Sequence, residues 1–168
     1  MKQLRALAVV IISAFLIASI GVQAGIIESR LPSQAAIASA HPAATAAGRE
    51  ILEAGGNAFD AAIAVASALA VVEPYSSGFG GGGFFLLHRA ADGKQTMLDA
   101  REKAPAASTH DMYLDEAGEF VRKRALNGPL AAGIPGIPAG LVHLAENYGR
   151  LPLKQSLVPA VRLATKGF

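Results

Sequence analysis

GGNAFDAAIAVASALAVV, residues 55–72, predicts a helix that is apolar on nearly every side. Asn57 is able to cap this helix, and Asp60 stands in the first turn, where the helix dipole favours an acidic side chain. The helix is expected over residues 58–72, because Pro74 follows. Alanines leave it hardly any polar face, at positions 58, 61, 62, 64, 66, 68 and 70. A helix of this kind is buried, and we expect residues 25–168 alone to be too few to surround it.

A second helix is expected just upstream of the buried one. Pro42 stands near its first position, where a missing N–H group costs nothing, and Gly55-Gly56 tolerate the left-handed conformation that ends a helix. Before it, residues 25–40 read as a lead-in with an apolar, strand-like stretch at 35–39.

Downstream of the buried helix, the pattern changes to that of a β-hairpin. FFLLH, residues 84–88, has the aromatic content and the length of a strand. Residues 91–94 supply the turn, and residues 95–99 return as the second strand.

The last third of the chain alternates between loops and helices. A polar stretch at 108–123 is followed by a Gly- and Pro-rich loop at 128–140. Helices are then expected at 139–148 and 155–166, with Gly167 as a cap. Helices combined with an antiparallel hairpin place the chain in the α+β class.

The first 24 residues predict a cleavable signal peptide. Lys2 and Arg5 precede an apolar run at 6–20, and small residues at 22 and 24 suit cleavage between Ala24 and Gly25. The run is shorter than the roughly 20 residues of a spanning helix, and a short membrane anchor is the alternative. We therefore expect residues 25–168 to be one exported segment, periplasmic or secreted.

Charge and cysteine content exclude several classes of function. The leader contains two of the 15 basic residues, so 13 basic residues remain against 13 acidic ones, and residues 25–168 are neutral. Without a basic cluster, nucleic acid is not an expected partner. The chain has no cysteine, which excludes disulfides and a thiol nucleophile.

The glycine run SSGFGGGG, residues 76–83, satisfies G-x-G-x-x-G but lies in the wrong context. A dinucleotide-binding fingerprint follows a strand and opens a helix, whereas this run follows a helix and opens a strand. We expect no cofactor there. The run is interpreted as a tight turn where another segment packs against bare backbone, with a substrate-facing turn as the alternative.

The histidines and serines form no recognisable catalytic or metal motif. No pair among the four histidines has i, i+4 spacing with a carboxylate nearby, so local spacing predicts no metal site. Ser77 lies outside a G-x-S-x-G setting, which argues against a nucleophile elbow.

Arg101 is the candidate substrate-binding residue. It stands just past the second hairpin strand, and its guanidinium matches a carboxylate bidentately. If the backbone stays extended, Arg101 and Glu102 point to opposite sides and do not reach one ligand. The alternative is an exposed surface charge pair.

Seven motifs, in this order and spacing, resemble the γ-glutamyltranspeptidases. They cover nearly all of the chain after the leader. They are HPxAT at 41–45, GGNAxDAA at 55–62, VEPxSSGxGGG at 72–82, LDxRExAP at 98–105, GxPGxxxGL at 133–141, YGxLP at 148–152 and PAxxLAxxGF at 159–168.

The resemblance implies an αββα-sandwich N-terminal-nucleophile hydrolase, made as a precursor that cleaves itself into a large and a small subunit. It implies a threonine nucleophile at the new N-terminus, with its own α-amino group as base. Glutathione and other γ-glutamyl compounds would be the donors, and water, amino acids or peptides the acceptors. At the position matching Arg101, the family's arginine pairs with the substrate α-carboxylate.

Family members are several times longer, so the chain is expected to be an N-terminal piece of the large subunit. The threonine would lie beyond residue 168, and no residue present is expected to be catalytic. The rest of the large subunit and the small subunit would be its partners. By itself the chain is expected to be inactive and to fold poorly. The alternatives are an acylase or a poly-γ-glutamate depolymerase of the same fold, or a non-catalytic binding remnant.

Overall fold

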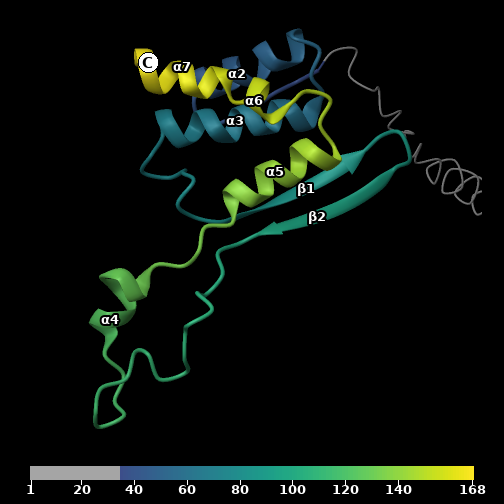
Figure 1. The fold of residues 1–168 in the computed structure, drawn as a ribbon. Helices are drawn as coiled ribbons and strands as arrows, with labels where there is room; N and C mark the ends of the chain where they lie inside the picture. Colours follow the sequence, from purple (N-terminus) through teal and green to yellow (C-terminus); the bar gives the residue numbers. More distant parts are fainter. Residues whose placement is uncertain (1–34) are drawn as a thin grey trace, which may run out of the picture. The chain divides into compact units, whose positions relative to one another are not determined.

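Helix α3 (Ala58–Val72) has the bounds that the sequence predicts. It lies between two layers in the computed structural model, which describes residues 35–168 (Figure 1). The predicted signal peptide lies outside these residues. Residues 37–168 form one unit of the chain. None of the described helices is both long and apolar enough to cross a membrane.

The predicted cap of α3 is confirmed, and it contains more hydrogen bonds than expected. Asn57 Oδ1 accepts hydrogen bonds from the N–H groups of Phe59 (2.9 Å) and Asp60 (3.1 Å). In return, Asn57 N donates to Asp60 Oδ2 at 2.8 Å, which completes a capping box. The start of the helix is therefore fixed by local chemistry.

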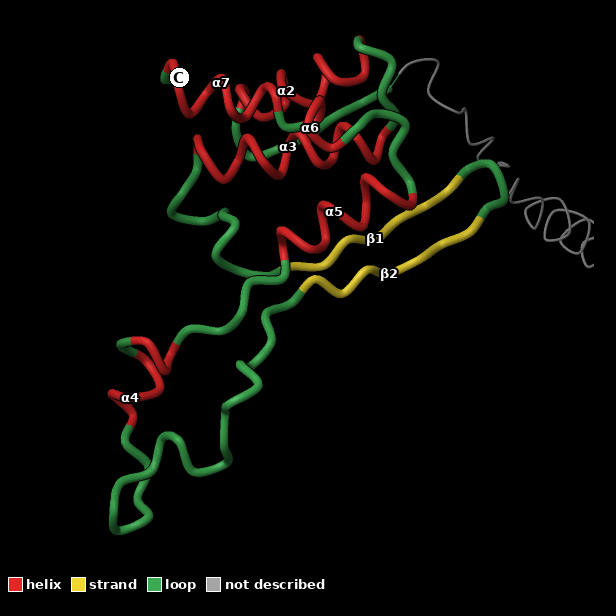
Figure 2. Tube along the Cα trace, viewed as in Figure 1, coloured by secondary structure: helices red, strands yellow, loops and turns green. Residues whose placement is uncertain are grey.

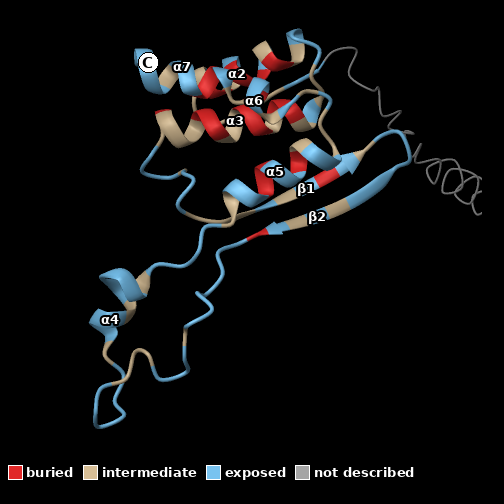
Figure 3. Ribbon diagram, viewed as in Figure 1, coloured by how far each residue is buried: buried red, intermediate tan, exposed pale blue. Residues whose placement is uncertain are grey.

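Both sides of α3 are covered by this chain, so the expectation that residues 25–168 could not surround it is wrong. Along one side, Ala64, Ala68 and Val72 pack with residues of α2 (Pro42–Glu53) and α7 (Val158–Lys166). Ile63 lies in a second cluster, with side chains of α5 (Ile137–Asn147) and of the hairpin. Buried positions accordingly gather on α2, α3 and α5 (Figure 3). The small alanine side chains allow this close packing.

Helix α2 is confirmed, but the strand predicted before it is wrong. His41 caps α2, because its Nδ1 accepts from Ala43 N at 3.1 Å, and Pro42 stands in the first turn. Gly55 follows the helix with a φ of 92°. Residues 35–39 have no regular structure. A strand needs a hydrogen-bonding partner, and among the described residues none pairs with this stretch.

The hairpin pairs β1 (Gly83–Arg89) with β2 (Lys94–Ala100), as the sequence predicts (Figure 2). Phe85 and Leu87 of β1 face the helices, whereas Phe84 and Leu86 are exposed on the outer face. At the turn, Arg89 donates to Asp92 and holds the pKa of that carboxyl at about 2, well below its ordinary value. The sheet therefore has one packed apolar face and one exposed apolar face.

The end of the chain has two helices where the sequence led us to expect one. Helix α6 (Leu153–Ser156) stops before Leu157, and α7 begins at Val158. Pro159 stands in the first turn of α7 and has no N–H to donate to the preceding turn, which explains the break. Gly167 caps α7 as predicted. Helix α5 starts two residues earlier than predicted, at Ile137.

Residues 104–133, here called the arm, leave the packed layers between β2 and α5 (Figures 1 and 3). They contain α4 (Arg122–Leu126) and a 3-10 turn, η1 (Pro129–Ala131), neither of which the sequence predicted. No residue of the arm is buried. Its base is closed by two hydrogen bonds, Lys103 N to Ile134 O (3.1 Å) and Ile134 N to Lys103 O (2.8 Å).

Candidate functional site

Arg101 occupies the first position after β2, as predicted. The strand ends at Ala100, and Arg101 N donates to the carboxylate of Asp99 at 2.9 Å. The Arg101 side chain remains 62% exposed, so its guanidinium is open to a ligand.

The expected divergence of the Arg101 and Glu102 side chains is wrong. Arg101 Nε lies 3.2 Å from Glu102 Oε2, so the two side chains meet as an ion pair. The Glu102 side chain is the less exposed partner, at 34%. Glu102 therefore holds one edge of the guanidinium and leaves the two terminal nitrogens directed elsewhere.

The glycine run packs against the backbone that carries Arg101. A Cβ added at Gly82 would lie 2.6 Å from Glu102 N and 2.7 Å from the Arg101 Cα, distances that real side chains do not adopt. The interpretation of this run as a turn that another segment packs against is confirmed. The structure brings Gly82 of the glycine run beside Arg101, although the two belong to separate motifs in the sequence.

A second glycine segment, residues 133–136, reaches the same backbone. A Cβ at Gly136 would collide with the carbonyl oxygens of Ala100 and Arg101 and would lie 2.6 Å from the Ala100 carbonyl carbon. The two glycine segments are also bonded to each other, because Gly81 O accepts from Gly136 N at 3.1 Å. Three chain segments thus meet at Arg101.

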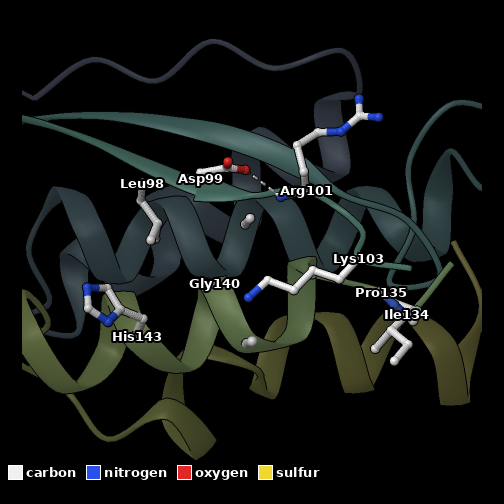
Figure 4. Close-up of a pocket in the computed structure, with 11 residues that line it drawn as sticks. Leu98, Asp99, Arg101, Lys103, Ile134, Pro135, Gly140 and His143 are labelled. Carbon is white, nitrogen blue, oxygen red and sulfur yellow. Dashed lines mark hydrogen bonds between the residues drawn. The ribbon is translucent and has the colours of Figure 1, made fainter. Parts of the chain in front are cut away.

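A hollow of about 360 Å³ lies beside this junction (Figure 4). In this view the Lys103 ammonium extends toward Gly140, and His143 lies farther along α5. The Arg101 guanidinium points away from both. Cationic groups on the two sides of the strand end are therefore separated. The hollow is lined by Leu98, Asp99, Ala100, Arg101, Lys103, Ile134, Pro135, Gly136, Ala139, Gly140 and His143.

Among residues 35–168, the exposed Arg101 guanidinium is a cationic group that could hold an anion. Within residues 35–168, no group of three or more His, Asp or Glu side chains could hold a metal ion. Thr45, a hydroxyl in the packed part, is bonded to Ser39 at 2.7 Å. The arrangement at Arg101 is suited to holding an anionic group at a strand end, beside exposed backbone.

Sequence reasoning missed the role of the second glycine segment. Gly-x-Pro-Gly at 133–136 was recognised as a motif and as part of a structured loop, but not as a neighbour of Arg101. Its proximity depends on the path of the arm, which returns the chain to the strand end. The motif itself was the signal, since it combines Pro with glycines on both sides.

Comparison with known proteins agrees with this architecture. Residues 44–168 match the model of the gamma-glutamyltranspeptidase family. The chain is 43% identical to the glutathione hydrolase proenzyme of Escherichia coli over 150 residues, 89% of this chain and 26% of that protein. The crystal structure of Helicobacter pylori gamma-glutamyltranspeptidase is similar with a TM-score of 0.74 and 44% identity, over 82% of this chain and 40% of that one.

A cephalosporin acylase from Bacillus halodurans is also similar, at 33% identity and a TM-score of 0.63, over 82% of this chain and 27% of that one. The chain spans about a quarter of the length of the curated relatives that it matches. The family match covers well over half of the chain and includes Arg101 and both glycine segments. This chain belongs to the gamma-glutamyltranspeptidase family.

Proposed function

We propose that this chain is the N-terminal part of the large subunit of an exported enzyme that transfers γ-glutamyl groups to water, amino acids or peptides. The observation that carries the proposal is the exposed guanidinium of Arg101, at a strand end inside the LDxREKAP motif of a family member. The complete enzyme would be an αββα-sandwich hydrolase. The hairpin and the helical layers around α3 would form part of it.

In this proposal, Arg101 binds the α-carboxylate of the γ-glutamyl donor. Glu102 engages Nε at 3.2 Å. Among residues 35–168, neither terminal nitrogen of Arg101 has a hydrogen-bond or ion-pair partner, which leaves both free for the two carboxylate oxygens. A charge-assisted, bidentate contact of this kind fixes the orientation of the donor as well as its position.

The remaining chemistry would come from outside this chain. A threonine hydroxyl would attack the γ-carbonyl and pass its proton to the α-amino group of the same threonine. The amide bond would break as the acyl-enzyme forms, and the amine half of that amide would leave with the proton. Water or an acceptor amine would then attack the acyl-enzyme and regenerate the hydroxyl. Glutathione has the required γ-glutamyl amide and free α-carboxylate. The 168-residue chain alone would be inactive.

The test uses a full-length precursor in which residues 25–168 replace the matching part of the E. coli glutathione hydrolase proenzyme. Three anilides are compared: γ-glutamyl, 4-aminobutanoyl (without the α-carboxylate) and glutaryl (without the amine). Arg101→Ala should lower kcat/KM for the γ-glutamyl anilide by some 30- to several-thousand-fold, because roughly 2–5 kcal/mol of charge-assisted binding is lost. The 4-aminobutanoyl substrate should be almost unaffected.

Two further variants control for charge and for folding. Arg101→Lys should restore only part of the activity, because an ammonium keeps the charge without the fork. Lys103→Ala removes a neighbouring cation directed to the other side of the backbone, and should change kcat/KM less than about threefold. An equal loss on all three substrates after Arg101→Ala, together with impaired self-cleavage, would make Arg101 structural. Preference for the glutaryl substrate would favour an acylase.

Export is part of the proposal and has its own test. The basic start, the apolar run and the small residues before Gly25 predict cleavage between Ala24 and Gly25. The chain should therefore reach the periplasm or medium with Gly25 as its first residue. N-terminal sequencing checks this, and an exported protein that still begins at Met1 would contradict it.

A further inference from the structure

We propose that Gly82 and Gly136 are positioning residues that hold the peptide of Arg101 in place, so that the guanidinium meets the substrate carboxylate. Both lie outside the segment that carries Arg101, and their proposed effect on the substrate is exerted through the Arg101 peptide. The inference rests on the proposed function of Arg101. It predicts that substrate selectivity depends on two glycines at which an added Cβ would meet backbone atoms and the Glu102 carboxylate first.

Position 136 requires glycine because there is no room for a Cβ, and not because of its backbone torsion angles. Its φ of −97° and ψ of −24° are in the right-handed helical region, which any residue adopts. A Cβ there would nevertheless collide with the carbonyl oxygens of Ala100 and Arg101. Carbonyl oxygens at a strand end cannot swing aside as a flexible side chain does. Even alanine would therefore displace the peptide of Arg101.

Gly82 acts on neighbouring atoms of the same peptide. A Cβ there would lie 2.7 Å from the Arg101 Cα, 2.6 Å from Glu102 N and 2.6 Å from Glu102 Oε2. The last atom is the one that pairs with Arg101 Nε. A side chain at position 82 would therefore move both the backbone of Arg101 and the carboxylate that orients its guanidinium.

Hydrogen bonds join the two glycine segments into one rigid support. Gly81 O accepts from Gly136 N (3.1 Å) and from Ile137 N (3.3 Å). Paired bonds between Lys103 and Ile134 close the other edge. Gly140 continues the contact along α5, where a Cβ would lie 2.8 Å from the Ala100 side chain. The support of the Arg101 peptide is therefore mostly backbone.

Rigidity at this point affects selectivity more than folding. To relieve the clash at Gly136, the carbonyls of residues 100 and 101 must move by about 1 Å, and a misplacement of that size can reduce a rate about 100-fold when geometry is critical. A donor with an α-carboxylate depends on this geometry. A donor without one does not contact Arg101 and should be insensitive to the shift.

The test compares glycine-to-alanine variants of the full-length precursor on the γ-glutamyl and 4-aminobutanoyl anilides. Gly136→Ala and Gly82→Ala should lower kcat/KM for the γ-glutamyl substrate by 10- to 100-fold, mainly through KM, and that for the 4-aminobutanoyl substrate by less than threefold. Gly133→Ala is a milder variant, because its Cβ would lie 3.0 Å from the Glu102 Cβ. It should give a selective loss below tenfold and keeps the test valid if a stronger variant fails to mature.

Gly80→Ala is the matched control in the same loop. No atom lies within 4 Å of a Cβ built there, and its φ is not in the left-handed region, so both substrates should be unaffected. Equal losses on both substrates in the Gly136, Gly82 and Gly133 variants, with Arg101→Ala still selective, would overturn this inference and leave the role of Arg101 standing. A non-selective Arg101→Ala would overturn both.

Discussion

Two aspartates, one in the packed part and one in the arm, make similar bonds in contrasting surroundings. Asp60, fully buried at the start of α3, accepts from the N–H groups of Asn57 (2.8 Å), Arg150 (3.0 Å) and Leu151 (3.3 Å). Asp115, exposed in the arm, accepts from Ala117 N (3.0 Å) and Glu119 N (2.9 Å).

The difference shows that a hydrogen-bonded turn does not by itself create a packed structure. Asp60 joins the start of α3 to the segment after α5 and is itself inaccessible to water. The Asp115 carboxylate bonds to the N–H groups of residues two and four positions along the chain. Water can replace either partner of an exposed hydrogen bond, so such a bond contributes little net free energy. When a buried acceptor is removed, its donors are left without a hydrogen-bond partner, which costs more.

The largest effect should follow from Asp60→Ala. Three N–H groups in part-buried hydrogen bonds lose their acceptor, and we expect the local free energy of unfolding to fall by about 3–5 kcal/mol. Hydrogen exchange measured by mass spectrometry on the full-length precursor should then speed up across α3 and at residues 148–151. Unchanged exchange in these peptides would mean that water replaces the carboxylate at no cost.

A smaller effect of opposite sign is expected from Ser67→Ala in the same helix. Ser67 is fully buried, and its hydroxyl has no hydrogen-bond partner among residues 35–168. Removing it eliminates an unsatisfied group and improves helix propensity, so stability should rise by about 1 kcal/mol. Thermal melting of the precursor checks the sign. A lower melting temperature would indicate that the hydroxyl is bonded in solution.

Asp115→Ala provides the matched change in the arm. The turn at residues 115–119 loses two exposed bonds, and we expect a local cost of about 0.5–1 kcal/mol. Faster hydrogen exchange should be confined to residues 113–121, with α3 and the hairpin unchanged. If exchange in α3 also accelerated, the arm and the packed part would be energetically coupled, and the contrast between the two aspartates would fail.

The smallest effect concerns the ion pair between Glu50 of α2 and Arg162 of α7. Its bonds to Arg162 lower the pKa of Glu50 below the ordinary value of 4.5. The stabilisation is therefore present above pH 4.5 and disappears as the pH falls through the lowered pKa. Both side chains are more than 40% exposed, so Glu50→Gln should cost only about 0.2–0.5 kcal/mol at pH 7.

Melting temperatures of the wild type and Glu50→Gln, measured from pH 7 down to pH 3, check this prediction. The two curves should converge at the acidic end. A difference that grows as the pH falls would contradict the assigned sign. High salt at pH 7 should also reduce the difference, because exposed charges are screened.

Elements with local signals were predictable from sequence. Asn57 and Asp60 set the start of α3, and the hairpin pairs as the aromatic content and length of its first strand and its turn predict. Pro159 is also a local signal for the break between α6 and α7, although one continuous helix was predicted there. Large apolar side chains are exposed on the outer face of β1 and β2, in the arm and on α7, whereas none is exposed on α3.

The sequence by itself determined the class of the fold, the bounds of α2 and α3, the hairpin and the family, because these follow from composition, caps and motifs along the chain. Only the tertiary structure decided that α3 is enclosed, that Glu102 pairs with Arg101, and that glycines 82 and 136 contact one peptide. Caps and turns depend on residues within about four positions. Close backbone contacts depend on segments far apart in the chain, whose meeting only the folded path determines.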